Sequence, residues 1–325
     1  MRADEPSATA VGVALIRATL DRPSTPTGDP AADDTLTRSL LGDGADPTTA
    51  GGDVEATHRG IVRFMAERTA FFDTAALRAI AAGTDQIVIL GAGYDGRGLR
   101  FRSPGVTFYE VDHPATQADK LARLHRLGIA TDAITFVAAD LTEPGLDDTL
   151  AAAGHRADTP TLFVVEGLLR YLPERTFREL PAILAARAAP GSEMAASVVT
   201  VAPDEDAAAA AAREEQDRRM ADLGEAVLTV PPRDTALRWI GEAGWTIESA
   251  DDVVNEHDAP TGRLLVLAHP SPTAMNRSGK AEVRLVAIRR DVETRPLGAL
   301  DVPNYWMSAD FDEPLDDVDH DFDPS

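Results

Sequence analysis

Glycines and acidic residues follow the apolar runs of this sequence at points that a sheet could bring together. The first run, residues 86–90, is followed by Gly91-Ala92-Gly93-Tyr94-Asp95. Acids also end or follow the next runs, and the candidates are Glu110, Asp112, Asp140 with its neighbour Leu141, and Glu166. Ligands bind beyond the carboxyl ends of the strands in an open parallel sheet. Glycines there let the backbone approach a ligand, and an acid after the second strand suits the two hydroxyls of a ribose.

The charge of this edge separates two classes of nucleotide ligand. Gly91, Gly93 and Gly96 satisfy the dinucleotide pattern G-x-G-x-x-G, and Asp112 follows about twenty residues later, so an NAD-dependent oxidoreductase is one alternative. A dinucleotide brings a pyrophosphate to the next helix N-terminus, where Asp95 would repel it. S-adenosylmethionine has no phosphate and carries a sulfonium and an ammonium. An acid-lined edge therefore favours S-adenosylmethionine as the cofactor.

An arginine upstream of the first strand could meet the carboxylate of that cofactor. The apolar periodicity of residues 55–80 predicts a helix, and Arg68 lies on its apolar stripe, four residues from both Phe64 and Phe72. An inward-pointing arginine needs a buried anion as its partner. A bidentate pair with a carboxylate would satisfy both groups. The alternative is a local ion pair with an acid such as Asp73.

The pattern around these residues predicts an α/β fold with a doubly wound, Rossmann-like sheet of seven strands. Parallel strands are expected over residues 86–90, 106–111, 134–138, 162–165 and 194–199, and a closing antiparallel pair over 245–249 and 263–269. Helices are expected near 96–101, over 114–127, from 173 to before 190, over 207–223 and over 234–242. Residues 207–223 carry dense charge and suggest an exposed cap.

We expect three parts along the chain. Residues 1–54 hold one helix, over 8–20, and then a stretch rich in Pro, Gly, Asp and Thr that is either a mobile lid or disordered. Residues 55–269 form the α/β domain. Residues 270–325 form a linker and an acidic tail that we expect to be extended or disordered.

The composition excludes several classes of function. The formal net charge of -23 argues against nucleic acid as a partner, because phosphate binding needs a basic stripe. The absence of cysteine excludes disulfides, cysteine-zinc sites and thiol nucleophiles, and no metal site is expected. No apolar run has the length of a signal or membrane segment, so we expect no membrane partner and a soluble, cytoplasmic protein.

Five segments in a fixed order carry a family resemblance. They are ERTAFFD at 67–73, GAGYDGR at 91–97, YEVDHP at 109–114, ADL at 139–141 and VEGLLRYL at 165–172. Together they resemble the leucine carboxyl methyltransferase family, which belongs to the class I S-adenosylmethionine-dependent methyltransferases. The similarity extends over roughly residues 11–269, with a weaker echo at 28–30.

The resemblance implies a role for each matching position. Arg68 would hold the cofactor carboxylate, Gly91 and Gly93 the methionine portion, Asp112 the ribose, Asp140 and Leu141 the adenine, and Glu166 the region of the amino group. Asp95 and Glu110 complete the expected cofactor-binding set. A proline or small apolar residue would be more typical of the family where Arg170 stands, so the resemblance does not carry over the identity of the substrate.

The expected reaction is O-methylation of a small molecule at a carboxylate or a hydroxyl. Methyl transfer from a sulfonium is an in-line displacement, for which positioning and water exclusion can supply most of the rate. A carboxylate acceptor needs mainly an orienting cation, for which Arg170 and Arg63 are candidates. A hydroxyl acceptor would gain from a base, either His113 or His58. Tyr171 is a further candidate substrate contact.

The acidic tail has a separate resemblance. Residues 278–288, 295–298 and 308–315 look like the C-terminal half of Phd/YefM-type antitoxins, and eight acids lie between Asp310 and Asp323. Such a segment would fold on a basic protein partner, which makes a non-catalytic binding protein a third hypothesis. The alternative is a solvated tail that only aids solubility.

Overall fold

A seven-stranded sheet forms the centre of the molecule, in the order β3-β2-β1-β4-β5-β7-β6. The computed structural model describes residues 7–41, 54–202, 207–222, 225–254 and 260–272. Strands β1 to β5 run parallel to one another, and β7 runs antiparallel to both of its neighbours, β5 and β6. They are β1 (Gln86–Leu90), β2 (Thr107–Asp112), β3 (Ile134–Ala138), β4 (Thr161–Val165), β5 (Glu193–Val199), β6 (Trp245–Val254) and β7 (Pro260–Pro270). The predicted doubly wound sheet and its closing pair are confirmed.

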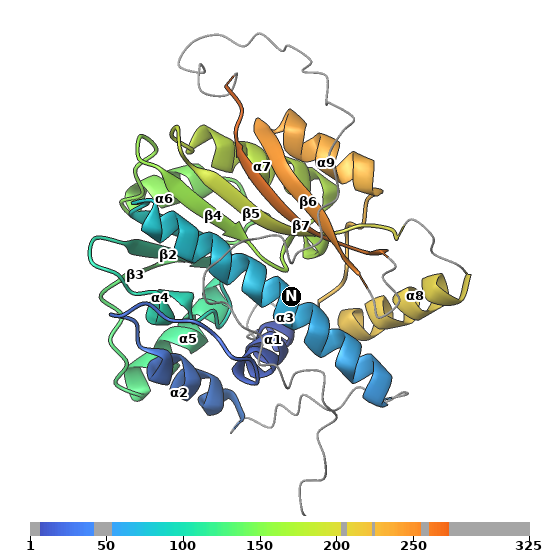
Figure 1. Ribbon diagram of the computed structural model, residues 1–325, viewed down its shortest axis with the longest axis horizontal. Helices are drawn as coiled ribbons and strands as arrows, with labels where there is room; N and C mark the ends of the chain where they lie inside the picture. Colours follow the sequence, from blue (N-terminus) through green and yellow to red (C-terminus); the bar gives the residue numbers. More distant parts are fainter. Residues whose placement is uncertain (1–6, 42–53, 203–206, 223–224, 255–259, 273–325) are drawn as a thin grey trace, which may run out of the picture.

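Helices cover both faces of the sheet (Figure 1). One face packs against α2 (Pro30–Leu41), α3 (Val54–Ala81), α4 (Arg97–Arg100) and α5 (Pro114–Arg126). The other face packs against α6 (Leu146–Ala152), α7 (Glu174–Ala186) and α9 (Arg233–Glu242). The remaining helices, which lie outside these two layers, are α1 (Ala8–Ala18), the 3₁₀ turn η1 (Leu169–Tyr171) and α8 (Ala207–Asp222).

The central strand shows why the sequence folds in this way. All five residues of β1 are buried, because β2 and β4 flank the strand and helices cover it on both sides. Ile87 and Ile89 pack into the apolar cluster beneath α3, whereas Val88 and Leu90 pack into the cluster beneath α7. A continuous apolar run is typical of a parallel strand buried on both faces. The chain reverses its strand order between β1 and β4, so the loop after β1 lies at the switch point where ligands bind.

No helix was predicted in the stretch after residue 20, but the structure has one over residues 30–41. These residues form α2, which Pro30 begins and whose Ala32 backbone N–H donates to Asp29 Oδ1 at 2.9 Å. Proline suits the first helical turn, and an Asp side chain satisfies the free N–H groups there. Leu36 and Leu40 of α2 are buried, so this helix is part of the packed core. The short helix α6 was also absent from the prediction.

Further predictions concern the location of the protein, its domain boundaries and its acidic tail. None of the helices among the described residues is long and apolar enough to cross a membrane. The cytoplasmic location stays a prediction, as do the two boundaries between the three predicted parts of the chain. The acidic tail from residue 273 onward, with its antitoxin resemblance, lies outside the described residues.

We predict that replacing Leu36 with Ala lowers the free energy of unfolding by about 2–4 kcal/mol, because a fully buried leucine would leave a cavity. Leu36 packs in the cluster that contains Phe72 and Leu99. Urea unfolding followed by circular dichroism measures the change. The matched control is Leu121→Ala on α5, since this leucine is 38% exposed and its truncation should change stability by less than about 0.5 kcal/mol. Equal urea midpoints for Leu36→Ala and the parent would show that α2 does not belong to the cooperative core.

Candidate functional site

The glycine loop after β1 is enclosed on two sides by other parts of the chain. Gly91 and Gly93 have φ angles of +65° and +51°, in the left-handed region that favours glycine. A Cβ at Gly91 would lie 3.1 Å from the Leu168 side chain, which precedes η1. A Cβ at Gly93 would lie 2.9 Å from Cβ of Ala10 in α1. The N-terminal helix therefore roofs the loop at the switch point of the sheet.

Asp112, at the end of β2, is joined directly to this loop. Its Oδ2 accepts a short hydrogen bond from the backbone N–H of Gly93, and its Oδ1 accepts one from the N–H of His113 at 2.6 Å. Burial raises the pKa of Asp112, and these two backbone hydrogen bonds oppose that rise. The acid after the second strand therefore lies beside the glycine turn, and its role at the ribose stays a prediction.

Glu166 follows β4 and is surrounded by guanidinium groups. Its carboxylate contacts Nη2 of Arg17 at 2.5 Å, Nε of Arg68 at 2.8 Å and Nη1 of Arg97 at 2.8 Å. Burial alone would raise the pKa of Glu166, but the three guanidiniums lower it to about 2. The anionic partner of Arg68 is therefore Glu166. The local alternative, Asp73, pairs instead with Arg97 and Arg100.

Asp95 takes part in the same network from the end of the glycine loop. Its Oδ1 accepts from the backbone N–H of Arg97 at 2.7 Å, and its Oδ2 pairs with Arg97 at 2.6 Å and with Arg17 at 3.4 Å. Burial opposes ionisation, yet these arginines hold the pKa of Asp95 well below its ordinary value. A carboxylate therefore already holds the start of α4, where the pyrophosphate of a dinucleotide would have to sit.

The edge is less purely acidic than the sequence suggested. Arg17 and Arg97 were not among the predicted residues, and both are buried beside the predicted acids. The signal that could have found Arg17 is its place on the buried side of α1 with Ala14 and Leu15, the same kind of signal that identified Arg68. The site is an interleaved set of carboxylates and guanidiniums.

Glu110 lies beneath the edge, where the side chain is 1% exposed. Its carboxylate pairs with Nζ of Lys120 at 2.5 Å, and the same ammonium donates to the backbone oxygen of Asp95 at 2.7 Å. Burial raises the pKa of Glu110 to about 7, against the opposing effect of Lys120. These contacts suit Glu110 to supporting the glycine loop from below.

The predicted adenine residues lie after β3. Asp140 is exposed, and its Oδ1 accepts from the backbone N–H of Thr142 at 2.9 Å and from the Thr142 hydroxyl at 2.7 Å. Leu141 is partly buried against the core. The N–H of Ala139 donates to the backbone oxygen of Asp112 at 2.9 Å, so this loop adjoins the ribose candidate.

The candidate acceptor residues are only partly brought together. Arg170, in η1, pairs through Nη2 with Asp217 of α8 at 2.8 Å, and its guanidinium carbon lies 5.6 Å from the centroid of the Tyr171 ring. Burial raises the pKa of Tyr171. His113 instead caps α5, because its Nδ1 accepts from the N–H of Ala115 at 3.3 Å.

The two other sequence candidates on α3 contribute less. Arg63 has a half-exposed side chain and forms an ion pair with Glu67 on the same helix at 3.0 Å, so its predicted role as an orienting cation has no support in its contacts. The side chain of His58 lies outside the described part of the chain.

A polar contact joins the N-terminus of α1 to the segment after α8. Glu225 is buried, and its Oε1 accepts from the hydroxyl of Ser7 at 2.6 Å and from the N–H of Thr9 at 3.2 Å. The segment continues to Thr229, whose hydroxyl donates to the backbone oxygen of Leu172 at 2.6 Å. The roof of the site is therefore fastened to residues that follow α8, a contact that no local pattern predicted.

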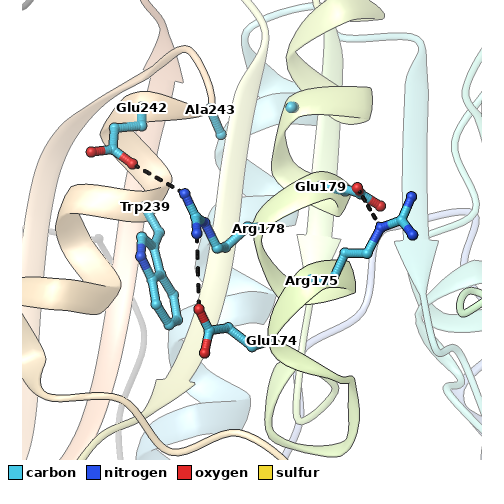
Figure 2. Close-up of a pocket in the computed structure, with 8 residues that line it drawn as sticks. Glu174, Arg175, Arg178, Glu179, Trp239, Glu242 and Ala243 are labelled. Carbon is cyan, nitrogen blue, oxygen red and sulfur yellow. Dashed lines mark hydrogen bonds and ion pairs between the residues drawn. The ribbon is translucent and has the colours of Figure 1, made fainter.

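A hollow elsewhere on the surface has a different character. It lies between α7 and α9, where Arg178 reaches Glu174 at 3.8 Å and Glu242 at 3.9 Å (Figure 2). The Arg178 guanidinium also lies 5.5 Å from the centroid of the Trp239 ring. The charges of this hollow are paired across two helices that cover the sheet, and its lining contains no glycine. It therefore lacks the glycine turn that the switch point provides.

Comparison with known proteins agrees with this geometry. A putative S-adenosyl-L-methionine-dependent methyltransferase of Mycolicibacterium paratuberculosis is 34% identical over 199 residues, which are 60% of this chain and 63% of that protein. The chain therefore spans less than two thirds of this relative. A second putative methyltransferase of the same organism is 35% identical over 75% of this chain and 84% of its own length. Neither comparison supports the NAD-dependent or the non-catalytic alternative.

A solved structure has the same fold. The crystal structure of a putative methyltransferase from Thermobifida fusca aligns with a TM-score of 0.52 and 14% identity, over 83% of this chain and 97% of that one. The model of the leucine carboxyl methyltransferase family matches residues 10–184, which include α1, the glycine loop, Asp112 and Glu166. With its sheet order, glycine turn and family match, the chain belongs to the leucine carboxyl methyltransferase family.

Proposed function

We propose that this protein is an S-adenosylmethionine-dependent O-methyltransferase that acts on a carboxylate or hydroxyl of a small molecule. The observation that carries the proposal is the gathering of Arg68, Asp112 and Glu166 around the glycine loop at the switch point. S-adenosylmethionine, when bound, supplies an activated methyl group on a sulfonium. The named relatives support the same cofactor.

The donor set of the site fits the groups of this cofactor. Arg68 is buried and lies against the backbone after β4, since a Cβ at Gly167 would be 3.3 Å from its Nη1. Its fork would hold the carboxylate, as guanidiniums do in bidentate pairs. Glu166 would hold the ammonium, Asp112 the ribose hydroxyls, and Asp140 with Leu141 the adenine. The backbone of Gly91 and Gly93 would contact the methionine portion.

The chain contributes positioning and exclusion of water. The roof formed by α1 is fixed by Arg17, whose guanidinium pairs with Glu166 and Asp95. Holding the reacting groups in line in a closed site can supply most of the acceleration of a displacement. This role needs no acid or base from the protein when the acceptor is a carboxylate.

The geometry gives little support to base catalysis by the predicted residues. Nδ1 of His113 is engaged as the cap of α5. Burial raises the pKa of Tyr171, so its hydroxyl is protonated at neutral pH and can donate a hydrogen bond to an acceptor oxygen. Tyr171 and Arg170 are therefore proposed to orient the acceptor.

We predict that the full chain binds S-adenosylmethionine and that Asp112→Ala weakens this binding at least about tenfold, because hydrogen bonds to a charged group contribute about 1.5–3 kcal/mol. Isothermal titration calorimetry measures the affinity. Asp112→Asn, which nearly preserves the shape, distinguishes loss of charge from loss of packing. The control is Asp85→Ala. Asp85 immediately precedes β1, is partly exposed and pairs with Arg156. Undetectable binding by the folded parent, or an NADH fluorescence response in its place, would contradict the assignment.

We predict that the charge network keeps its stabilising effect down to low pH. The three guanidiniums lower the pKa of Glu166 to about 2 in the folded protein. Its ionised carboxylate therefore stabilises the fold fully at pH values above the ordinary glutamate pKa of about 4.3. This contribution is lost as the pH falls from about 4.3 towards 2. Thermal unfolding should therefore give a large Tm gap between the parent and Glu166→Gln at pH 7 that narrows across this window. Glu143→Gln, at an exposed position, should track the parent throughout. A gap that is constant from pH 7 to pH 2 would refute the ionised network.

We predict that the parent transfers label from methyl-labelled S-adenosylmethionine to a small molecule in an extract of the host. Mass spectrometry identifies the compound that gains a methyl group. Label released by mild alkali indicates a methyl ester, and alkali-stable label indicates an ether. Asp112→Ala is the inactive control. Label recovered only in macromolecules would reject the small-molecule acceptor, and no transfer by a preparation that binds the cofactor would reject the activity.

A further inference from the structure

A guanidinium that no sequence motif identified lies at the same edge of the sheet. Arg263 is near the beginning of β7, and its register partner is Val199, the last residue of β5. Because β7 runs antiparallel to β5, Arg263 lies at the carboxyl end of β5. The preceding residue fixes this position, since the backbone oxygen of Gly262 accepts from the N–H of Thr200 at 2.6 Å and from its hydroxyl at 3.1 Å.

Aromatic rings link this arginine to the site already described. The guanidinium carbon of Arg263 lies 4.8 Å from the centroid of the Phe64 ring, and that of Arg68 lies 5.2 Å from the same centroid. Burial lowers the pKa of Arg263, and the nearby charge of Arg170 lowers it further. Arg68, Arg170 and Arg263 therefore gather around Phe64 and Tyr171.

The three arginines differ in their partners. Arg68 pairs with Glu166 and Arg170 with Asp217, whereas Arg263 has no ion pair among the residues that the structure describes. The acid whose charge raises the pKa of Arg263, against the effects of burial and Arg170, is Asp252. The Oδ1 of Asp252 is engaged by the backbone N–H groups of Thr261 at 2.9 Å and Gly262 at 3.1 Å.

A guanidinium withdrawn from water without an anion is costly, and a carboxylate or similar anion is the group that best relieves the cost. The Nε of Arg170 is also buried without a hydrogen-bond partner in the described structure. Arg263, which is partly buried, and Arg170 are thus neighbouring cations, and Asp217 is the one acid that forms an ion pair with either of them among the described residues. Their charge predicts an anionic ligand.

Two exposed apolar residues are joined through the backbone to the segments that carry these cations. Leu228 is 57% exposed and its N–H donates to the backbone oxygen of Arg170 at 2.8 Å. Val201 is 38% exposed and follows Thr200, which is bonded to Gly262. A binding site usually combines apolar walls with a few polar groups that fix orientation. The ligand should therefore join an anionic group to an apolar body.

We propose that Arg263, with Arg170, binds the anionic group of an organic acid whose apolar body lies against Leu228 and Val201, and that this acid is the methyl acceptor. The identification of the acid as the acceptor rests on the function proposed above, whereas its binding does not. Arg263 is thereby a specificity-determining residue that selects anionic over neutral molecules. Such a residue accounts for further cations at a site in which Arg68 is assigned to the cofactor carboxylate.

The test uses the full chain with octanoate and benzoate as anionic probes and octanamide as the neutral analogue, each titrated by calorimetry. We expect at least one acid to bind, and octanamide to bind about tenfold more weakly than octanoate, since a charge-assisted hydrogen bond is lost. Arg263→Gln should weaken the acid about tenfold and change octanamide less than about twofold. Arg263→Lys should recover part of the affinity.

A matched control removes an arginine of the same kind at a distance. Arg178→Gln deletes a guanidinium that also lies over an aromatic ring, Trp239, and should leave binding of the acid unchanged (Figure 2). Thermal unfolding confirms that each variant is folded, and Arg263→Lys serves as the test if Arg263→Gln is not. The inference is overturned if neither acid binds, if octanamide binds as well as octanoate, or if binding is insensitive to Arg263.

Titration of the same samples with S-adenosylmethionine separates this inference from the proposed function. Arg263→Gln should bind the cofactor as the parent does, because Arg263 is not among the proposed cofactor residues. A parent that binds octanoate through Arg263 but not the cofactor would refute the methyltransferase and leave the anion site standing. A parent that binds the cofactor but neither acid would refute only the anion site.

Discussion

Burial of charge at the carboxyl edge of the sheet is the constraint on which the rest of the structure depends. Arg97 is 1% exposed and contacts Asp73 at 2.6 Å, Asp95 at 2.6 Å and Glu166 at 2.8 Å. An ion withdrawn from water in this way costs several kcal/mol unless its partners are well placed, and removal of one partner leaves an uncompensated charge. The position of one arginine in α4 thus requires α3, the glycine loop and the end of β4 to come together at the same point.

The same requirement draws the N-terminal helices into the domain. Arg17 reaches Glu166 from α1, while Asp33 of α2 pairs with Arg22 at 2.7 Å and with Arg100 at 3.0 Å. Asp33 also packs so closely on the start of α4 that a Cβ at Gly96 would lie 1.9 Å from its Oδ1. Gly96 therefore has a role in helix packing, although it completes the pattern of a dinucleotide-binding loop. The match to that pattern has a structural cause that requires no dinucleotide.

The sequence allowed prediction of the parts of the fold that depend on local pattern. The five parallel strands were predicted within one residue because each contains an apolar run that the sheet buries, as in β1. The closing pair is longer than predicted, since β6 ends five residues later and β7 begins three residues earlier. The helix α2 was not predicted because the residues around its start have the composition of a loop. Asp29 and Pro30 nevertheless form a regular helix start. Arg17 and Arg97 were not identified because their shared partner Glu166 is distant in sequence. Arg263 was not identified because its aromatic neighbour, Phe64, is also distant. Glu110 was predicted to bind the ligand because it lies near the end of its strand. The local sequence does not show that its partner is the buried ammonium of Lys120.

The balance of charges in this network also bears on the choice of cofactor. An acid-lined edge favoured S-adenosylmethionine in the sequence, but in the structure guanidiniums already match the carboxylates of Asp95 and Glu166. The ammonium and the carboxylate of that cofactor can exchange for the pair between Arg68 and Glu166, and its sulfonium adds one positive charge to an edge that also holds Asp112. A pyrophosphate would add negative charge beside Asp95 and bring no cation to compensate it. The preference for a ligand that brings both an ammonium and a carboxylate thus follows from the paired network more directly than from a surplus of acids.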